Sequence, residues 1–223
     1  MADGRLARLR HRLRRDGVGA VLRKAFADHV FRSSASVVLE ADSRDVRLGE
    51  IRVDPGVALL AISGDDPVPP LCPWMRHRHA DFARMLKAGL LGFFVLRDRI
   101  AVGCAWIALS DHHDPRTREY YAVAPGEAYH FSWLLDPAER PRGTALPFVR
   151  WVVATLRNRG VRRMYGVVDR ANRASYRVLE RFGYRESGTL VRHYVLLHRC
   201  WTRVSRYDGT LGLYDPRRGR RRA

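Results

Sequence analysis

The stretch from residue 127 to residue 184 constrains the fold most, because strand and helix patterns follow one another there in a fixed order. Its segments are an alternating run (127–135), a basic segment (136–145), an amphipathic segment (146–160), a short apolar run (163–168) and a closing helical pattern (169–184). These patterns predict a strand, a loop, a helix, a strand and a second helix. Such an order places an anion-binding loop at a helix N-terminus beside the open end of a sheet.

The basic segment has the features of a phosphate-binding loop. Pro147 fits a helix only in its first turn, so the helix is expected to begin near Gly143. Gly143 permits a positive φ and a close approach of the backbone to a ligand, and Thr144 suits the N-cap position. Arg140 and Arg142 add positive charge beside the positive end of the helix dipole. The segment is therefore a candidate phosphate cradle.

The alternating run predicts which side chains share a face of its strand. Alternation places one group of residues (Tyr129, Phe131, Trp133 and Leu135) on one face and a second group (His130, Ser132 and Leu134) on the other.

The stretch resembles the core of the GNAT superfamily of N-acetyltransferases. The family's pyrophosphate loop reads Gln or Arg, two residues, Gly, one residue, then Gly or Ala, and Arg140, Gly143 and Ala145 match it. The family's next signature is an Asn after the following strand, then a short helix ending in Gly-Phe or Gly-Tyr. The matching residues are Asn172, Ser175, Phe182, Gly183 and Tyr184. The resemblance covers about residues 127–184.

The resemblance implies an α/β GNAT fold, with a central, mixed, mostly antiparallel, twisted sheet flanked by helices. It implies acetyl-coenzyme A, or another acyl-coenzyme A, as the donor. The strand 129–135 would splay from the strand 164–168 and open a wedge for the pantetheine arm. A backbone N–H near Leu134 or Leu135 would polarise the thioester carbonyl. The implied cofactor-binding set is Leu134, Leu135, Arg140, Arg142, Gly143, Thr144, Ala145, Asn172 and Ser175.

The residues for proton transfer follow the family pattern less closely. Many members carry a tyrosine seven residues after the Asn, as general acid for the leaving thiolate, and Leu179 stands there in this chain. Tyr176 and Tyr184 are the alternatives for that role. His130 and Glu127, on or just before the wedge strand, are the candidates for the general base.

Two functions follow from the resemblance. The first is an acyl-coenzyme A dependent N-acetyltransferase in which the amine of a small molecule, such as an amino sugar, amino acid or polyamine, attacks directly. The alternative is a catalytically weak or inactive GNAT-fold protein with a coenzyme A-binding, regulatory or assembly role, which Leu179 favours.

Composition limits the classes of molecule that the chain is expected to bind. The net charge of +18 favours anionic ligands, but no helix-turn-helix, RNA-recognition or zinc-finger signature points to specific nucleic-acid binding. The three cysteines, Cys72, Cys104 and Cys200, are too far apart in sequence to suggest a disulfide framework or a zinc site. The acidic and histidine residues at 111–114 are adjacent, so they cannot all face one ion, and no metal site is predicted.

The sequence also predicts three parts of the chain. Residues 1–32 form a basic amphipathic helical appendage that either packs on protein or lies on an anionic membrane. Residues 33–204 form the GNAT domain, and residues 205–223 form a basic, disordered tail. The sequence shows neither a signal peptide nor an apolar run of ~20 residues, which favours the cytoplasm. Homodimerisation is left open.

Outside the central stretch, the patterns predict further elements. Strands are expected at 36–40, 46–53, 57–62, 93–96, 100–109, 190–197 and 201–204, and a helix is expected at 79–90. A turn at 54–56 is expected to pair the second and third of these strands, and residues 110–127 are expected to form a polar connection.

Overall fold

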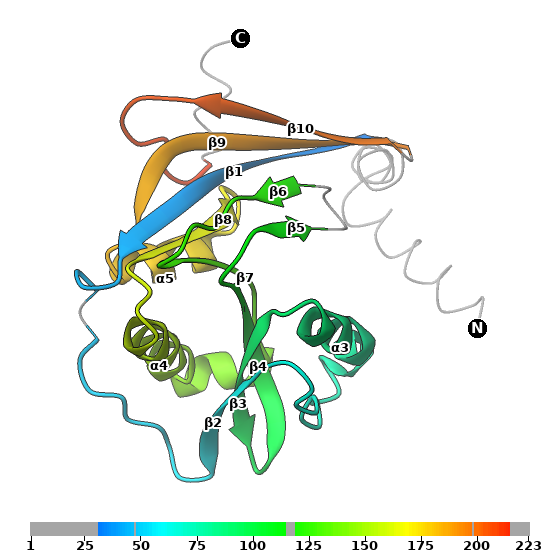
Figure 1. The fold of residues 1–223 in the computed structure, drawn as a ribbon, viewed down its shortest axis with the longest axis vertical. Coiled ribbons are helices and arrows are strands. Elements are labelled where there is room, and N and C mark those ends of the chain that lie inside the picture. Colours follow the sequence, from blue (N-terminus) through cyan, green and yellow to red (C-terminus); the bar gives the residue numbers. More distant parts are fainter. Residues whose placement is uncertain (1–30, 47, 115–118, 198, 215–223) are drawn as a thin grey trace, which may run out of the picture.

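The computed structural model describes residues 31–46, 48–114, 119–197 and 199–214. Its centre is an eight-stranded sheet in the order β10-β9-β1-β8-β7-β4-β3-β2 (Figure 1). The strands are β1 (Phe31–Asp42), β2 (Val57–Ile62), β3 (Leu91–Arg97), β4 (Ile100–Ala108), β7 (Glu127–Leu135), β8 (Arg163–Asp169), β9 (Arg185–Leu196) and β10 (Arg199–Arg206). Only β7 and β8 pair in parallel within this sheet. The predicted mixed, mostly antiparallel α/β sheet is confirmed.

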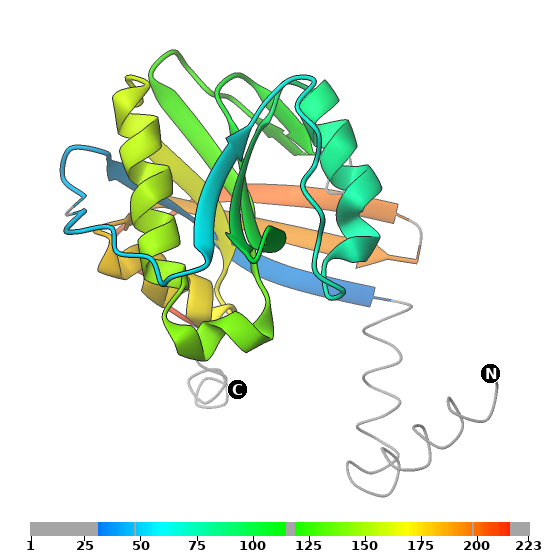
Figure 2. The ribbon, with the colours of Figure 1, turned by 90° about the horizontal axis from the view of Figure 1, so that it is seen from below.

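Helices cover both faces of the sheet. Helices α4 (Ala145–Asn158) and α5 (Arg173–Arg181) lie on one side, and η1 (Arg76–Arg78) and α3 (His79–Lys87) lie on the other (Figures 1 and 2). Phe93 and Phe94 are neighbours on β3 and therefore point to opposite faces. Phe93 packs against Trp151 of α4 at 5.3 Å between ring centroids, and Phe94 packs against Phe82 of α3 at 5.9 Å. Strands β3 and β4 are consequently buried along nearly their whole length.

The predicted strand at 46–53 is wrong. Residues 48–53 form no strand, and β2 pairs with β3 instead. The reason is topological: β1 and β2 lie on opposite sides of the sheet's parallel pair, so the connection has to cross over α4. It is held there by helix arginines, because Arg157 donates to the carbonyls of Ser43 and Val46, and Arg150 donates to that of Glu50.

The connection at 110–127 contains structure that the sequence did not predict. Strands β5 (His112–Asp114) and β6 (Glu119–Tyr121) form a small antiparallel sheet. Aromatic stacking attaches this sheet to β7. His112 lies 4.7 Å from Phe131, and Tyr121 lies 4.2 Å from Tyr129, between ring centroids. Figure 1 shows the hairpin on the α3 side of the main sheet.

The last described residues belong to the domain, which corrects the prediction that a disordered tail begins at residue 205. Strand β10 continues to Arg206, and residues 207–214 fold back over β9 and the end of β8. The Glu186 carboxylate accepts hydrogen bonds from the Tyr207 hydroxyl and from the Leu211 and Gly212 amides. The predicted N-terminal helix and the remainder of the tail lie outside the described residues. Among the described helices, none is long and apolar enough to cross a membrane.

Candidate active site

The parallel strands β7 and β8 part from one another. Their register holds only for three residue pairs and ends where Tyr129 lies opposite Tyr165. Beyond that point the strands diverge, and a cavity of about 1210 Å³ fills the gap. Leu134 and Leu135 line it from β7, and Gly166 lines it from β8. The predicted wedge is therefore confirmed.

A bulge in β7 corrects the predicted alternation. Phe131 lies opposite Trp106, whereas Leu134 lies opposite Cys104, so one residue of β4 faces two of β7. Ser132 adopts a positive φ of 50° at this point. Because of the bulge, the residues after it point to the face opposite to the one that regular alternation predicts. Trp133 consequently lies beside His130 and packs on the α4 side, instead of sharing a face with Phe131.

The predicted phosphate loop has the expected backbone form. A 3-10 helix, η2 (Pro137–Arg142), ends at Gly143, which has a φ of 72°, and α4 starts at Ala145. A Cβ placed on Gly143 would meet no atom within 4 Å, so the backbone is open to a ligand there. Arg140 and Ala145 line the large cavity. The expected helix start near Gly143 is confirmed.

The loop is anchored by a carboxylate that sequence reasoning missed. Glu139 is buried and receives both Nε and Nη2 of Arg97 at 2.8 Å each. The Thr144 hydroxyl also donates to it, at 3.0 Å, and Arg142 lies 3.3 Å away. The Arg97 hydrogen bonds lower the pKa of Glu139, so the pair is charged. Thr144 occupies the N-cap position but makes no side-chain capping bond, which corrects its predicted capping role.

Asn172 lies on the opposite wall of the cavity. Its side-chain oxygen accepts a hydrogen bond from the Ser175 amide at 3.2 Å, so Asn172 caps α5. Both residues line the large cavity, together with Leu179. The structure therefore brings the loop and the second family signature to the same cavity from two sides.

His130 lies in the cavity wall as a neutral, buried imidazole. Its Nδ1 accepts the Trp133 indole N–H at 3.0 Å, and burial lowers its pKa to about 4. The neutral ring then carries its proton on Nε2, a buried atom with no hydrogen-bond partner among the described residues. Gly166 permits this packing, because a Cβ there would lie 2.5 Å from His130 Cε1. The arrangement does not fit the predicted role of general base.

The other three residues that were predicted to transfer protons make their contacts outside the large cavity. Glu127 pairs with Arg163 at 2.7 Å, and although burial raises its pKa, the Arg163 hydrogen bond leaves it lowered overall. Tyr176 donates to Glu186 at 2.7 Å, and burial together with that bond raises its pKa to about 12. Burial raises the pKa of Tyr184, whose hydroxyl lies 3.8 Å from Met164 Sδ. None of the three lines the large cavity.

Part of the cavity wall comes from strands that sequence reasoning did not associate with the site. Ser34 and His193 are register partners on β1 and β9, and Thr202 on β10 is the next partner across. All three line the cavity. The alternating serines of β1 were a visible signal, but their partners are about 160 residues away in the sequence. No group of three metal-ligating side chains occurs within the described ranges.

A sheet that parts between two parallel strands, with a glycine loop before the next helix, is the arrangement that the resemblance to N-acetyltransferases implied. The family model for the acetyltransferase (GNAT) domain matches residues 40–185. The chain belongs to the GNAT acetyltransferase family.

Solved structures of similar fold share little sequence. They include a GCN5-related N-acetyltransferase from Kribbella flavida (16% identity, 77% of this chain and 62% of that chain, TM-score 0.45). A tandem GNAT protein from the clavulanic acid biosynthesis pathway has 15% identity over 79% of this chain and 59% of that chain, with a TM-score of 0.50. A functionally unknown conserved protein from Staphylococcus epidermidis has 12% identity over 80% and 67%, with a TM-score of 0.50. The chain spans about three fifths of the length of the first two. No curated protein matches the sequence.

Proposed function

We propose that the protein is an acetyl-coenzyme A dependent N-acetyltransferase that acts on the amine of a small molecule. One observation supports this most strongly: the cavity between β7 and β8 is lined by both family signatures, Arg140 and Ala145 on one side and Asn172 on the other. Another acyl-coenzyme A would fit the same donor site. A cytoplasmic location stays a prediction from the sequence.

The residues present fit the cofactor. The open backbone at Gly143 and the side chain of Arg140 suit a diphosphate, because amide N–H groups at a helix start and a guanidinium both bind anions. The edge of β7 beyond Tyr129 has no strand partner on β8, so its amides are available to the pantetheine arm. Asn172 and Ser175 would complete the site from α5. Acetyl-coenzyme A supplies the activated acetyl thioester when bound.

The chain's own contribution is then orientation and polarisation. A backbone N–H near Leu134 or Leu135, on a strand fixed by its pairing with β4, would donate to the carbonyl oxygen of the thioester. His130 holds Trp133 in place through its Nδ1, and it supplies no base at neutral pH. We propose that the attacking amine enters deprotonated from solvent and that solvent protonates the leaving thiolate.

A second function is favoured by the placement of Tyr176, Tyr184 and Leu179. Leu179 lines the cavity where a proton donor is often found, and neither tyrosine does. A GNAT-fold protein of weak or absent activity, with a coenzyme A-binding, regulatory or assembly role, has the same cavity and needs no proton donor.

Two measurements on the full chain separate these functions. Isothermal titration with acetyl-coenzyme A should show 1:1 binding, and thiol release should accelerate when amino sugars, amino acids or polyamines are added. Binding without amine-dependent thiol release would favour the second function. Absence of binding would exclude the first function and would leave, of the second, only a regulatory or assembly role that needs no coenzyme A.

A further inference from the structure

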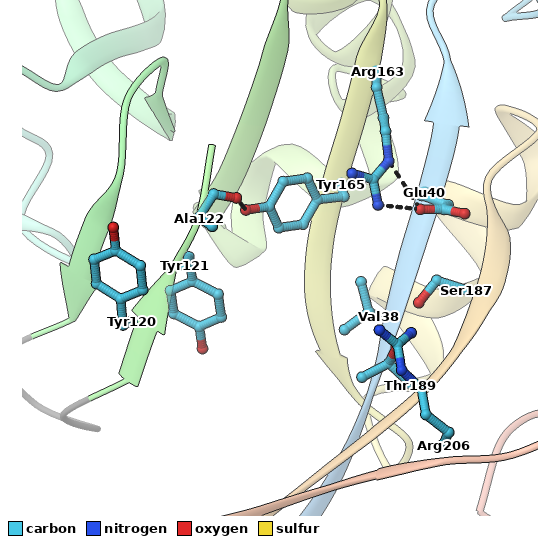
Figure 3. A pocket seen from close by; sticks show the side chains of 10 residues that line it. All are labelled: Val38, Glu40, Tyr120, Tyr121, Ala122, Arg163, Tyr165, Ser187, Thr189 and Arg206. Atoms are coloured by element: carbon cyan, nitrogen blue, oxygen red, sulfur yellow. Dashed lines mark hydrogen bonds and ion pairs between the residues drawn. The ribbon is translucent and has the colours of Figure 1, made fainter. Parts of the chain in front are cut away.

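A second, smaller depression adjoins the large cavity on the α3 side of the sheet. It has a volume of about 430 Å³ and lies between the β5–β6 hairpin and the strands β8, β1, β9 and β10 (Figure 3). Tyr121 lines both spaces. Tyr165, where the β7–β8 pairing ends, also lines the depression. The two spaces therefore adjoin at Tyr121.

Two arginines line the depression, and the positive charge of one of them, Arg163, is already compensated by carboxylates. Arg163 donates to Glu40 through Nε at 3.0 Å and Nη2 at 2.6 Å, and to Glu127 through Nη1 at 2.7 Å. Its guanidinium carbon also lies 5.3 Å from the centre of the Tyr165 ring. Two carboxylates and an aromatic face leave Arg163 little capacity to bind a ligand.

Two of the tyrosines that line the depression are held in place by hydrogen bonds from their hydroxyl groups. The Tyr165 hydroxyl donates to the Ala122 carbonyl at 2.6 Å, and the Tyr120 hydroxyl donates to Asp111. Figure 3 shows Tyr121 on the side of β6 that is nearer to the strands carrying Ser187 and Arg206, and Tyr120 on the other side of β6, toward β5. The rings therefore supply aromatic surface to whatever lies between the two sides.

The second arginine is available and oriented. Arg206 donates through Nη1 to the Thr189 hydroxyl at 2.7 Å, and it forms no ion pair with any carboxylate in the described part of the chain. The neighbouring Ser187 hydroxyl is buried and finds no hydrogen-bond partner there. A guanidinium and a hydroxyl of this kind are donors suited to a carboxylate or phosphate. The net charge of +18 favours the approach of an anion.

We propose that this depression binds an anionic group of the acceptor, with Arg206 and the Ser187 hydroxyl as donors. The acceptor would then be a small molecule with an amine at one end and a carboxylate or phosphate at the other. Gly166, in the wedge, lies three positions after Arg163, at the depression, which is roughly 10 Å along β8. The statement that the acceptor carries an amine rests on the proposed acetyltransferase function. The statement that the depression binds an anion does not rest on it.

The test uses three probes of equal length: 6-aminohexanoate, 4-aminobutyl phosphate and 6-aminohexanamide, whose amide end is uncharged. Their dissociation constants are measured by NMR titration of the full chain without coenzyme A, so that binding does not depend on turnover. The variant is Arg206→Gln. The matched control is Arg203→Gln. Arg203 is an exposed arginine three positions before Arg206 on the same strand, and an odd offset places the two side chains on opposite faces.

At least one anionic probe should bind about tenfold or more tightly than the amide, and the stronger of the two identifies the group. Arg206→Gln should remove that preference, and Arg203→Gln should keep it. Equal affinities for all three probes, or a preference that survives Arg206→Gln, would overturn the proposal. Failure of acetyl transfer while the Arg206-dependent preference persists would overturn the proposed function alone.

Discussion

Trp133 donates its indole N–H to Nδ1 of His130 at 3.0 Å, across the bulge of the wedge strand. The two residues stand three apart, and in a regular strand they would point to opposite faces. The bulge at Ser132 brings them to the same side, beneath the cavity. Burial keeps His130 neutral, and the pairing holds the strand edge that would bind the cofactor.

The first prediction concerns stability and pH. The pKa of His130 is lowered from 6.5 to about 4 by burial, so the unfolded chain takes up this proton at a higher pH than the folded chain. The free energy of unfolding should therefore fall as the pH is lowered from 6.5 to 4, by about 3 kcal/mol from this residue, at about 1.4 kcal/mol for each pH unit. Urea unfolding of the native chain and of His130→Gln, across that range, measures the difference. Identical pH dependence in both chains would contradict the assignment.

The second prediction concerns the rate of acetyl transfer. Because His130 stays neutral with its Nδ1 occupied, its own titration should not appear in the rate between pH 6 and 8. The rate constant kcat/KM should instead rise about tenfold per pH unit until the pKa of the acceptor amine is reached, since only the neutral amine attacks. Thiol release followed from pH 6 to 9 with two amines of different pKa is the measurement. A bend near pH 6.5 that is the same for both amines and disappears in His130→Gln would restore His130 as the base.

The third prediction concerns the anchor of the phosphate loop. Glu139→Ala removes the carboxylate that holds Arg97 and the Thr144 hydroxyl. The free energy of unfolding should drop by about 2–4 kcal/mol, because Arg97 loses a nearly buried partner. Acetyl-coenzyme A affinity should fall about tenfold or more, because Gly143 and Arg140 lose their support.

The control for that variant is Glu50→Ala, whose exposed carboxylate pairs only with exposed Arg52 among the described residues. It should change the free energy of unfolding by less than about 0.5 kcal/mol. Chemical denaturation and isothermal titration measure both effects. Unchanged coenzyme A affinity in Glu139→Ala would show that the loop does not depend on this anchor.

The fourth prediction concerns the C-terminal segment 207–214. Glu186 accepts hydrogen bonds from Tyr176, Tyr207 and the Leu211 and Gly212 amides. Replacing it by Ala should leave these donors without their acceptor and release the segment. Amide hydrogen exchange at Leu211 and Gly212 should accelerate by tenfold or more. Glu180→Ala, which removes an exposed partner of Arg177, should leave that exchange unchanged; equal protection in both variants would contradict the role of Glu186.

Local patterns predicted the central stretch well, since each depends on neighbouring residues. The alternation of 127–135 gave the bounds of β7, and Pro147 placed the start of α4. The bulge was not predictable, because nothing in Ser132 itself signals a positive φ; the register with β4 determines it.

Other features depend on contacts between distant segments. The strand expected at 46–53 failed because the path from β1 to β2 crosses α4, which no local pattern shows. The Glu139–Arg97 anchor joins residues 42 apart, and the side-chain roles of Tyr176 and Tyr184 are set by Glu186 and Met164. The loop, the start of α4 and the divergence of β7 from β8 could therefore be predicted from the sequence, and the cofactor-binding roles of their residues stay predictions. The contacts of the residues proposed for proton transfer could not be predicted.

The central claim is that the gap between β7 and β8 is the acyl-coenzyme A site. A crystal structure of the full chain grown with saturating coenzyme A tests it most directly. The account predicts the diphosphate against residues 140–145 and the pantetheine arm between the two strands, with its thiol beyond the point where Tyr129 lies opposite Tyr165. Coenzyme A bound elsewhere, with the wedge empty, would contradict it.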